Sequence, residues 1–213
     1  MEMSDFFDFG SRFALVNFLA GPEELNFKTE VDDGLKLIKG DYKFIKFPVV
    51  FKQDKESGKR FSDILDTGHP NLYLISDRMK TVLEENNLTG WKTYPIKLYD
   101  KKGNEIFGYH GFSIVGRCEK LSYERSEVIK KSYVPNGPIC KFYKGIDVIK
   151  WDGSDFFTPK ETYHIIITKK VSKILEKEKI TNLELVNLFD AEVDVDNIPP
   201  GRRKKNSENG WVI

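Results

Sequence analysis

Four carboxylates near the end of the chain alternate with alanine and valine. They form an acidic stripe of Asp190, Glu192, Asp194 and Asp196. On an extended chain every second side chain points the same way, so all four carboxylates share one face. Such a face could complement a basic surface on a partner protein. It could instead guard a strand edge against pairing with another sheet. Both interpretations stay open, and the first makes these four residues candidates for partner binding.

Other residues that could do chemistry form no motif. The sequence has no phosphate-binding glycine loop, no HExxH and no GxSxG. A pair such as His110 with Cys118 could act as base and nucleophile, but such pairs are defined by geometry and not by sequence. The acidic stripe lacks the glycine that a helix-loop-helix calcium loop needs at its sharp turn. We therefore predict no catalytic residue, no metal site and no cofactor.

Composition limits the class of protein. The chain has 213 residues and a formal net charge of +1, so no overall field attracts nucleic acid or an anionic membrane. Its two cysteines are too few for a disulfide framework. The acidic start MEMSDFFDFG lacks the features of a signal peptide, and no apolar run is long enough to span a bilayer. These features predict a soluble cytoplasmic protein that binds neither nucleic acid nor membrane.

The elements that would position these residues begin with a strand, a short helix and a second strand in residues 71–98. Residues 72–75 are continuously apolar, which is typical of a strand covered on both faces. The helix is indicated by apolar residues at i, i+3 and i+4, namely Met79, Val82 and Leu83. Residues 91–98 alternate like a strand again.

The same plan recurs in residues 162–188. The expected helix caps are Ser76 and Thr168, a shift of 92 residues (168 − 76) that needs no gap. That shift superposes the helical triplet on Val171, Ile174 and Leu175. Two copies are too few for a solenoid, so the pattern predicts a duplicated half-domain. The alternative is that any short capped helix between strands has this pattern.

Together the elements predict an α+β fold, with a mixed, strand-rich sheet, few short helices and two related strand-helix-strand half-units. We expect one globular domain over residues 1–198, with halves at about 40–134 and about 139–198, and a flexible basic tail at 199–213. A strand that returns to its sheet through a helix should give parallel neighbours. Residues 35–38 and 42–51 are predicted to be strands, the latter at a sheet edge because of Pro48. Residues 61–65 are predicted to form a helical turn.

These motifs resemble a family of bacterial proteins assigned as immunity proteins of polymorphic toxin systems. The matching stretches are Pro48–Phe51, Phe61–Leu65, Leu74–Lys80, Leu88–Gly90, Glu124–Ser126, Ile166–Val171 and Ile180–Asn182. In that family an apolar strand ends in a Ser-Glu-Arg-Leu-Lys-like helix start, and a Leu-Thr-Gly turn leads to the next strand. The second copy departs from the pattern at Lys169 and Asn182.

The resemblance covers roughly residues 40–190. It implies a fold and a role, the cytoplasmic neutralisation of a cognate toxin by direct binding, but no catalytic residue. Two other functions stay open. The chain could be a small enzyme whose site is assembled from residues distant in sequence, or an interaction protein without a toxin partner. A toxin gene immediately upstream would favour the first interpretation.

Overall fold

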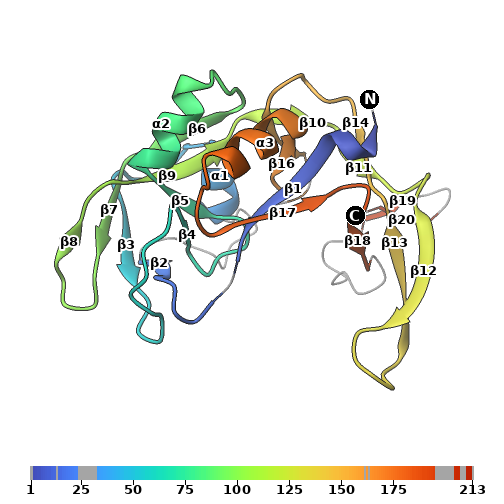
Figure 1. Ribbon diagram of the computed structural model, residues 1–213, viewed down its shortest axis with the longest axis horizontal. Helices are drawn as coiled ribbons and strands as arrows, with labels where there is room; N and C mark the ends of the chain where they lie inside the picture. Colours follow the sequence, from blue (N-terminus) through green and yellow to red (C-terminus); the bar gives the residue numbers. More distant parts are fainter. Residues whose placement is uncertain are drawn as a thin grey trace.

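The computed structural model describes residues 2–12, 14–23, 33–160, 162, 164–194, 204–206 and 210–212 (Figure 1). Two sheets contain the predicted units. The first has the strand order β4-β5-β9-β6. Its strands are β4 (Ile64–Asp66), β5 (Tyr73–Ser76), β9 (Tyr109–Ile114) and β6 (Trp91–Tyr94). Helix α2 (Asp77–Glu85) connects β5 to β6.

The second sheet repeats this order as β15-β16-β1-β17, with β10 added beside β15. Its strands are β15 (Phe156–Pro159), β16 (Ile166–Thr168), β1 (Phe6–Ser11), β17 (Leu183–Asn187) and β10 (Gly116–Cys118). Helix α3 (Lys169–Lys177) connects β16 to β17 and lies 92 residues after α2 at both ends (169 − 77 and 177 − 85). Two related strand-helix-strand units are therefore present.

In each sheet a further strand lies between the two strands of the unit, and the two sheets take this strand from different parts of the chain. In the first sheet β9 follows its unit, whereas in the second β1 is supplied from the N-terminus. Both are antiparallel to their neighbours. The prediction of parallel neighbours was therefore wrong. The strands joined by each helix run parallel, but another strand separates them. The predicted division into halves stays a prediction, and the second sheet requires β1, which lies outside both predicted halves.

Asp63, immediately before β4, connects the first unit to the second through hydrogen bonds. Its Oδ2 accepts hydrogen bonds from the backbone N–H of Thr181 at 2.9 Å and from Thr181 Oγ1 at 2.8 Å. Ser76 Oγ donates to Oδ1 at 2.8 Å, and Arg78 pairs with the carboxylate at 2.7 Å. Burial alone would raise the pKa of Asp63. The hydrogen bonds from Thr181 and Ser76 and the charge of Arg78 outweigh burial and hold this pKa below its ordinary value.

Asp155 makes the equivalent contact in the opposite direction. It lies 92 residues after Asp63 (155 − 63) and accepts from the backbone N–H of Thr89 at 3.0 Å and from Thr89 Oγ1 at 3.1 Å. Its further partners are the counterparts of Ser76 and Arg78, namely Thr168 at 3.4 Å and Lys170 at 3.3 Å. We call the two sets the reciprocal Asp–Thr contacts. Because each unit binds the other in the same way, an approximate two-fold axis relates the units.

One hydrophobic cluster runs through both units. On α2 the residues Met79, Val82 and Leu83 are buried, and on α3 Val171 and Leu175 are buried while Ile174 is half-buried. Between the sheets Phe9 of β1 lies 6.1 Å from Phe112 of β9, measured between ring centroids. Since the Phe9 and Phe112 rings also contact Phe156, the two sheets share one aromatic centre.

The remaining elements surround this centre. A third sheet has the order β2-β3-β7-β8, formed by β2 (Ala20–Pro22), β3 (Val49–Gln53), β7 (Ile96–Tyr99) and β8 (Glu105–Ile106). The short helical segments are η1 (Met3–Asp5) and α1 (Asp33–Lys39). A two-stranded pair joins β11 (Lys120–Ser122) to β14 (Asp147–Ile149). Among the described residues the helices are few and short, which confirms the α+β, strand-rich prediction.

A further hairpin projects from the body of the molecule (Figure 1). We call it the arm; it consists of β12 (Glu127–Ser132) and β13 (Ile139–Lys144). The short strand β18 (Glu192–Val193) pairs with β13. Of the predicted tail, the structure describes β19 (Lys204–Asn206) and β20 (Gly210–Val212), which pair antiparallel. The predicted flexibility of residues 199–213 stays a prediction.

Three local predictions were wrong. Residues 35–38 belong to α1 because the buried Leu37 and Ile38 occupy one side of a helical turn, and a four-residue apolar run does not distinguish a helix from a strand. Residues 64–66 form β4 and not a helical turn. The strand predicted over 42–51 begins only at Val49, as β3, and it lies between β2 and β7 and not at a sheet edge. Pro48 precedes its first residue, so the missing N–H removes no bond from the ladder.

Candidate partner-binding surfaces

The acidic stripe lies against the arm. Strand β18 pairs with β13 so that Glu192 is opposite Lys144 and Val193 is opposite Tyr143. The predicted alternation is present from Asp190 to Glu192, since Ala191 is buried between two exposed residues, but Val193 and Asp194 are both half-buried. Asp196 lies outside the described residues. Asp190 lies in the turn after β17, and β18 contains Glu192 and Val193, so the described part of the stripe is extended only from Ala191 onward.

Residues of the arm contact all three described carboxylates. Lys131 forms an ion pair with Glu192, and Tyr133 Oη donates a hydrogen bond to Asp194 Oδ2 at 2.7 Å. Lys144 Nζ lies 3.8 Å from Asp190 Oδ1. The stripe thus helps to hold the arm in place. Asp190 has the loosest of these pairs and keeps 64% of its side chain exposed, whereas Glu192 keeps 29%.

The arm also exposes apolar side chains. Val128 and Ile139 are 48% and 69% exposed, and Val134 at the turn is 59% exposed. Strand β12 is at the end of its sheet in the order β12-β13-β18. The structure therefore brings the stripe together with an exposed apolar edge, which the sequence did not indicate.

The three histidines lie in separate surroundings. His69 Nδ1 is 3.1 Å from the carbonyl oxygen of Pro70, and His110 Nε2 is 2.6 Å from Asp77 Oδ1. His164 Nδ1 lies 3.2 Å from Asp8 Oδ2. Burial alone would lower the pKa of His164, but the hydrogen bond and the charge of Asp8 outweigh it and raise this pKa above its ordinary value.

Cys118, the nucleophile of the possible pair with His110, is buried. Burial, followed by the charge of Asp152, raises the pKa of this thiol to about 11, so the group is protonated at neutral pH. His110 on β9 pairs with Asp77 of α2. Within the described part of the chain, no three or more His, Cys, Asp or Glu side chains gather in a way that could hold a metal ion.

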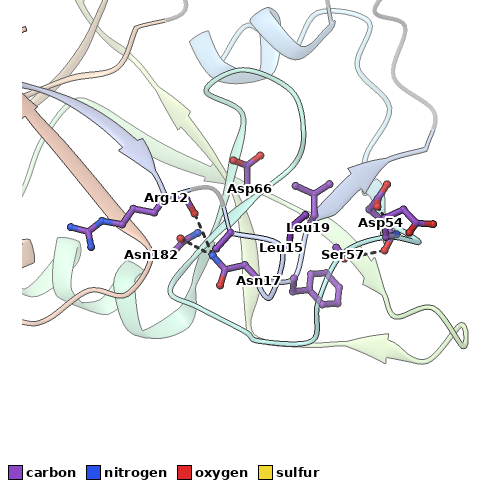
Figure 2. A pocket seen from close by; sticks show the side chains of 11 residues that line it. Arg12, Leu15, Asn17, Leu19, Asp54, Ser57, Asp66 and Asn182 are labelled. Atoms are coloured by element: carbon purple, nitrogen blue, oxygen red, sulfur yellow. Dashed lines mark hydrogen bonds between the residues drawn. The ribbon is translucent and has the colours of Figure 1, made fainter. Parts of the chain in front are cut away.

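A hollow of about 120 Å³ lies between the segment after β1 and the loop after β3 (Figure 2). Its apolar lining residues, which we call the floor, are Ala14, Leu15, Phe18 and Leu19. Carboxylates and other polar groups line the rest, namely Arg12, Asn17, Asp54, Glu56, Ser57, Asp66 and Asn182. Figure 2 shows the Arg12 guanidinium pointing away from the other labelled side chains. The charged residues that line the hollow are therefore mainly carboxylates.

Sequence reasoning left this hollow unpredicted. The run from residue 13 to Leu19 is apolar, which favours burial, yet Leu15 and Val16 are 72% and 57% exposed. An argument from hydrophobic periodicity assigns every residue of such an apolar run to the core. It therefore cannot recognise two neighbouring apolar residues that are exposed. The turn at Leu15 and Val16 could only be assigned once the pairing of β1 was known.

None of the helices in the described residues has both the length and the apolar character needed to cross a bilayer. The model of one protein family, described as the immunity protein family (Imm11), matches residues 6–189. The match therefore includes β1, both units and the arm. The comparison with curated proteins found no match.

Proposed function

Because the chain belongs to the immunity protein family Imm11, we propose that it binds a cognate bacterial toxin in the cytoplasm of the producing cell and neutralises it. The observation that carries this proposal is the family match over residues 6–189. The match begins at the first residue of β1, the strand that completes the second sheet.

In this proposal the protein inhibits by occupying a surface of the toxin and not by chemistry. Two groups that could otherwise do chemistry support this interpretation, because one has a structural role and the other is buried. Asp63 is engaged by Thr181, Ser76 and Arg78 between the units. The buried thiol of Cys118 has a raised pKa, which makes it a poor nucleophile.

A protection experiment tests the proposal. The toxin domain encoded beside this gene should arrest growth when expressed alone in a bacterial host, and co-expression of this chain should restore growth. The two purified proteins should also form a complex in size-exclusion chromatography. A toxin domain from an unrelated system is the control and should remain toxic. If the chain neither binds nor protects, the proposed function is wrong for that pair.

We further propose that the Asp190 end of the acidic stripe faces a basic surface of the toxin. Asp190→Lys should lower the association rate several-fold at low salt and have less effect as salt rises, because exposed charges act mainly by steering. Stopped-flow mixing with the toxin domain across a salt series measures this. Glu192→Lys and Asp194→Lys should slow association as well, although Glu192→Lys also removes the ion pair with Lys131.

Glu84→Lys is the matched control for Asp190→Lys. Glu84 lies on α2, is 56% exposed and pairs with Lys80 at 3.8 Å, the same separation as between Asp190 and Lys144. Its reversal changes the net charge equally but leaves the stripe intact. Equal association rates for Asp190→Lys and the parent protein at every salt concentration would mean that the stripe only fastens the arm.

A further inference from the structure

The chain segments that follow β1 and β9 can be compared position by position, because these two strands occupy equivalent places in their sheets. Ser11 ends β1 opposite Leu183, and Ile114 ends β9 opposite Trp91. Since Leu183 lies 92 residues after Trp91 (183 − 91), Ser11 and Ile114 occupy the same place in their sheets. The two strands therefore leave their sheets at equivalent points.

The connection reaches equivalent points again a few residues later. Leu19 forms a parallel bridge with Asp66, and Arg117 pairs in parallel with Thr158, 92 residues after Asp66 (158 − 66). From Ser11 to Leu19 the chain advances eight positions (19 − 11), but from Ile114 to Arg117 it advances three (117 − 114). The first connection contains five additional residues (8 − 3). We call the part of this connection before Phe18, of which the structure describes residues 12 and 14–17, the inserted loop.

At the equivalent place in the second unit the Arg117 side chain occupies the space. The Arg117 guanidinium donates to the carbonyl oxygens of Ile114 at 2.6 Å and Gly116 at 2.8 Å, and lies 3.4 Å from Thr158 Oγ1. Leu19 replaces Arg117 in the first unit, and the inserted loop opens the hollow there. In the described residues, the second unit therefore has the same strands and helix as the first but lacks this hollow.

The inserted loop is held rigidly by its neighbours. The backbone N–H of Arg60 donates to Val16 O at 3.1 Å, and that of Gly58 donates to Asn17 O at 3.0 Å. The buried Asn17 side chain accepts from Arg60 Nε at 2.9 Å and donates to Asn182 Oδ1 at 3.0 Å. Leu15 and Val16 are thus presented to solvent by ordered backbone, so a partner would not have to order the loop on binding.

The exposed apolar surface continues beyond the loop. Phe61 is 48% exposed and stacks on Phe18 with 4.8 Å between the ring centroids. Asp54, Glu56 and Asp66 surround the apolar floor, while the Arg12 guanidinium points away (Figure 2). An apolar centre within a charged rim is the usual anatomy of a specific protein interface.

We propose that the inserted loop and its hollow are the anchor site for the toxin. The occupant is a toxin segment that places an apolar side chain against Leu15 and the floor, with a lysine or arginine beside it facing Asp54, Glu56 and Asp66. Charge complementarity and the exposed leucine and valine select this occupant. This inference rests on the proposed function and adds an apolar anchor site to the charged contact proposed for the acidic stripe.

The test is Leu15→Glu in the full chain, with the toxin domain encoded beside the gene as the probe. Truncating a hot-spot residue, of the kind that clusters at the centre of an interface, weakens binding by about 30-fold or more. We expect a loss of that size in Kd by isothermal titration calorimetry. Because Leu15 is 72% exposed, the thermal midpoint should stay that of the parent.

Val115→Glu is the matched control, since Val115 is the single residue between β9 and β10 in the equivalent connection and is 40% exposed. It should bind as the parent does. Equal Kd values for Leu15→Glu and the parent would overturn the anchor site but not the proposed function. A parent protein that does not bind the toxin domain would overturn both.

Glu56→Lys tests the predicted charge of the occupant separately. Glu56 is exposed at the rim, so its reversal should weaken binding several-fold at low salt if the toxin presents a basic residue there. Tighter binding by Glu56→Lys would show an acidic occupant and overturn the proposal in this respect.

Discussion

Leu83→Ala and Leu175→Ala should each lower the free energy of unfolding by about 2–5 kcal/mol. Both side chains are 0% exposed, and they occupy equivalent positions on α2 and α3 (175 − 83 = 92). Alanine removes three carbons from a close-packed core and leaves a cavity that the surrounding sheets cannot fill. Urea unfolding followed by tryptophan fluorescence measures the change through the midpoint.

Ile174→Ala is the control for Leu175→Ala. Ile174 is the neighbouring residue on α3 but is only half-buried, so its truncation should cost about 1 kcal/mol. Both leucines belong to one cluster, and we therefore expect a single unfolding transition in every variant. Midpoints equal to that of the parent for both leucine variants would contradict the tight packing of the two helices.

The two helices could be predicted from sequence because their signals are local. Ser76 is the N-cap of α2 and its Oγ accepts a hydrogen bond from the backbone N–H of Met79 at 3.1 Å. The apolar triplets specify the buried side of each helix. The cap of α3 differs in its contacts, since Thr168 Oγ1 lies 3.4 Å from Asp155 and makes no cap bond.

The position of β1 could not be predicted because its partners are distant in sequence. Phe7 pairs with Ile167 on one side and with Asn187 on the other, so the evidence for this strand lies at the opposite end of the chain. Without β1, the equivalence of its exit with that of β9 is invisible. The inserted loop was missed for this reason and not because its residues are unusual.

The acidic stripe shows the same division between local and distant information. Its alternation is local, and the structure has Ala191 buried between two exposed carboxylates. The residues that contact it, Lys131 and Lys144, come from the arm. Sequence alone indicates a charged face, but not that part of its charge is already paired within the molecule.

Asp63→Ala should lower the free energy of unfolding by about 3 kcal/mol, because it leaves the Thr181 N–H and the Ser76 hydroxyl without their acceptor and removes the ion pair with Arg78. Asp155→Ala should cost less, about 1–2 kcal/mol, since the equivalent hydrogen bonds are longer at 3.0, 3.1 and 3.4 Å. Urea midpoints at pH 7 measure both. A double-mutant cycle of Asp63→Ala with Thr181→Val should give a coupling of about 1–3 kcal/mol.

The pH dependence of stability distinguishes the contribution of the ionised Asp63 carboxylate from that of the residues around it. The folded pKa of Asp63 is below its ordinary value, so the unfolded chain takes up the proton first as pH falls. The stability from this group is fully present above the unfolded pKa of about 3.9 and is lost as pH falls through the folded pKa. The difference between the parent and Asp63→Asn should therefore shrink in acid. Equal costs for Asp63→Ala and an exposed control such as Glu84→Ala would contradict a stabilising role of the reciprocal Asp–Thr contacts.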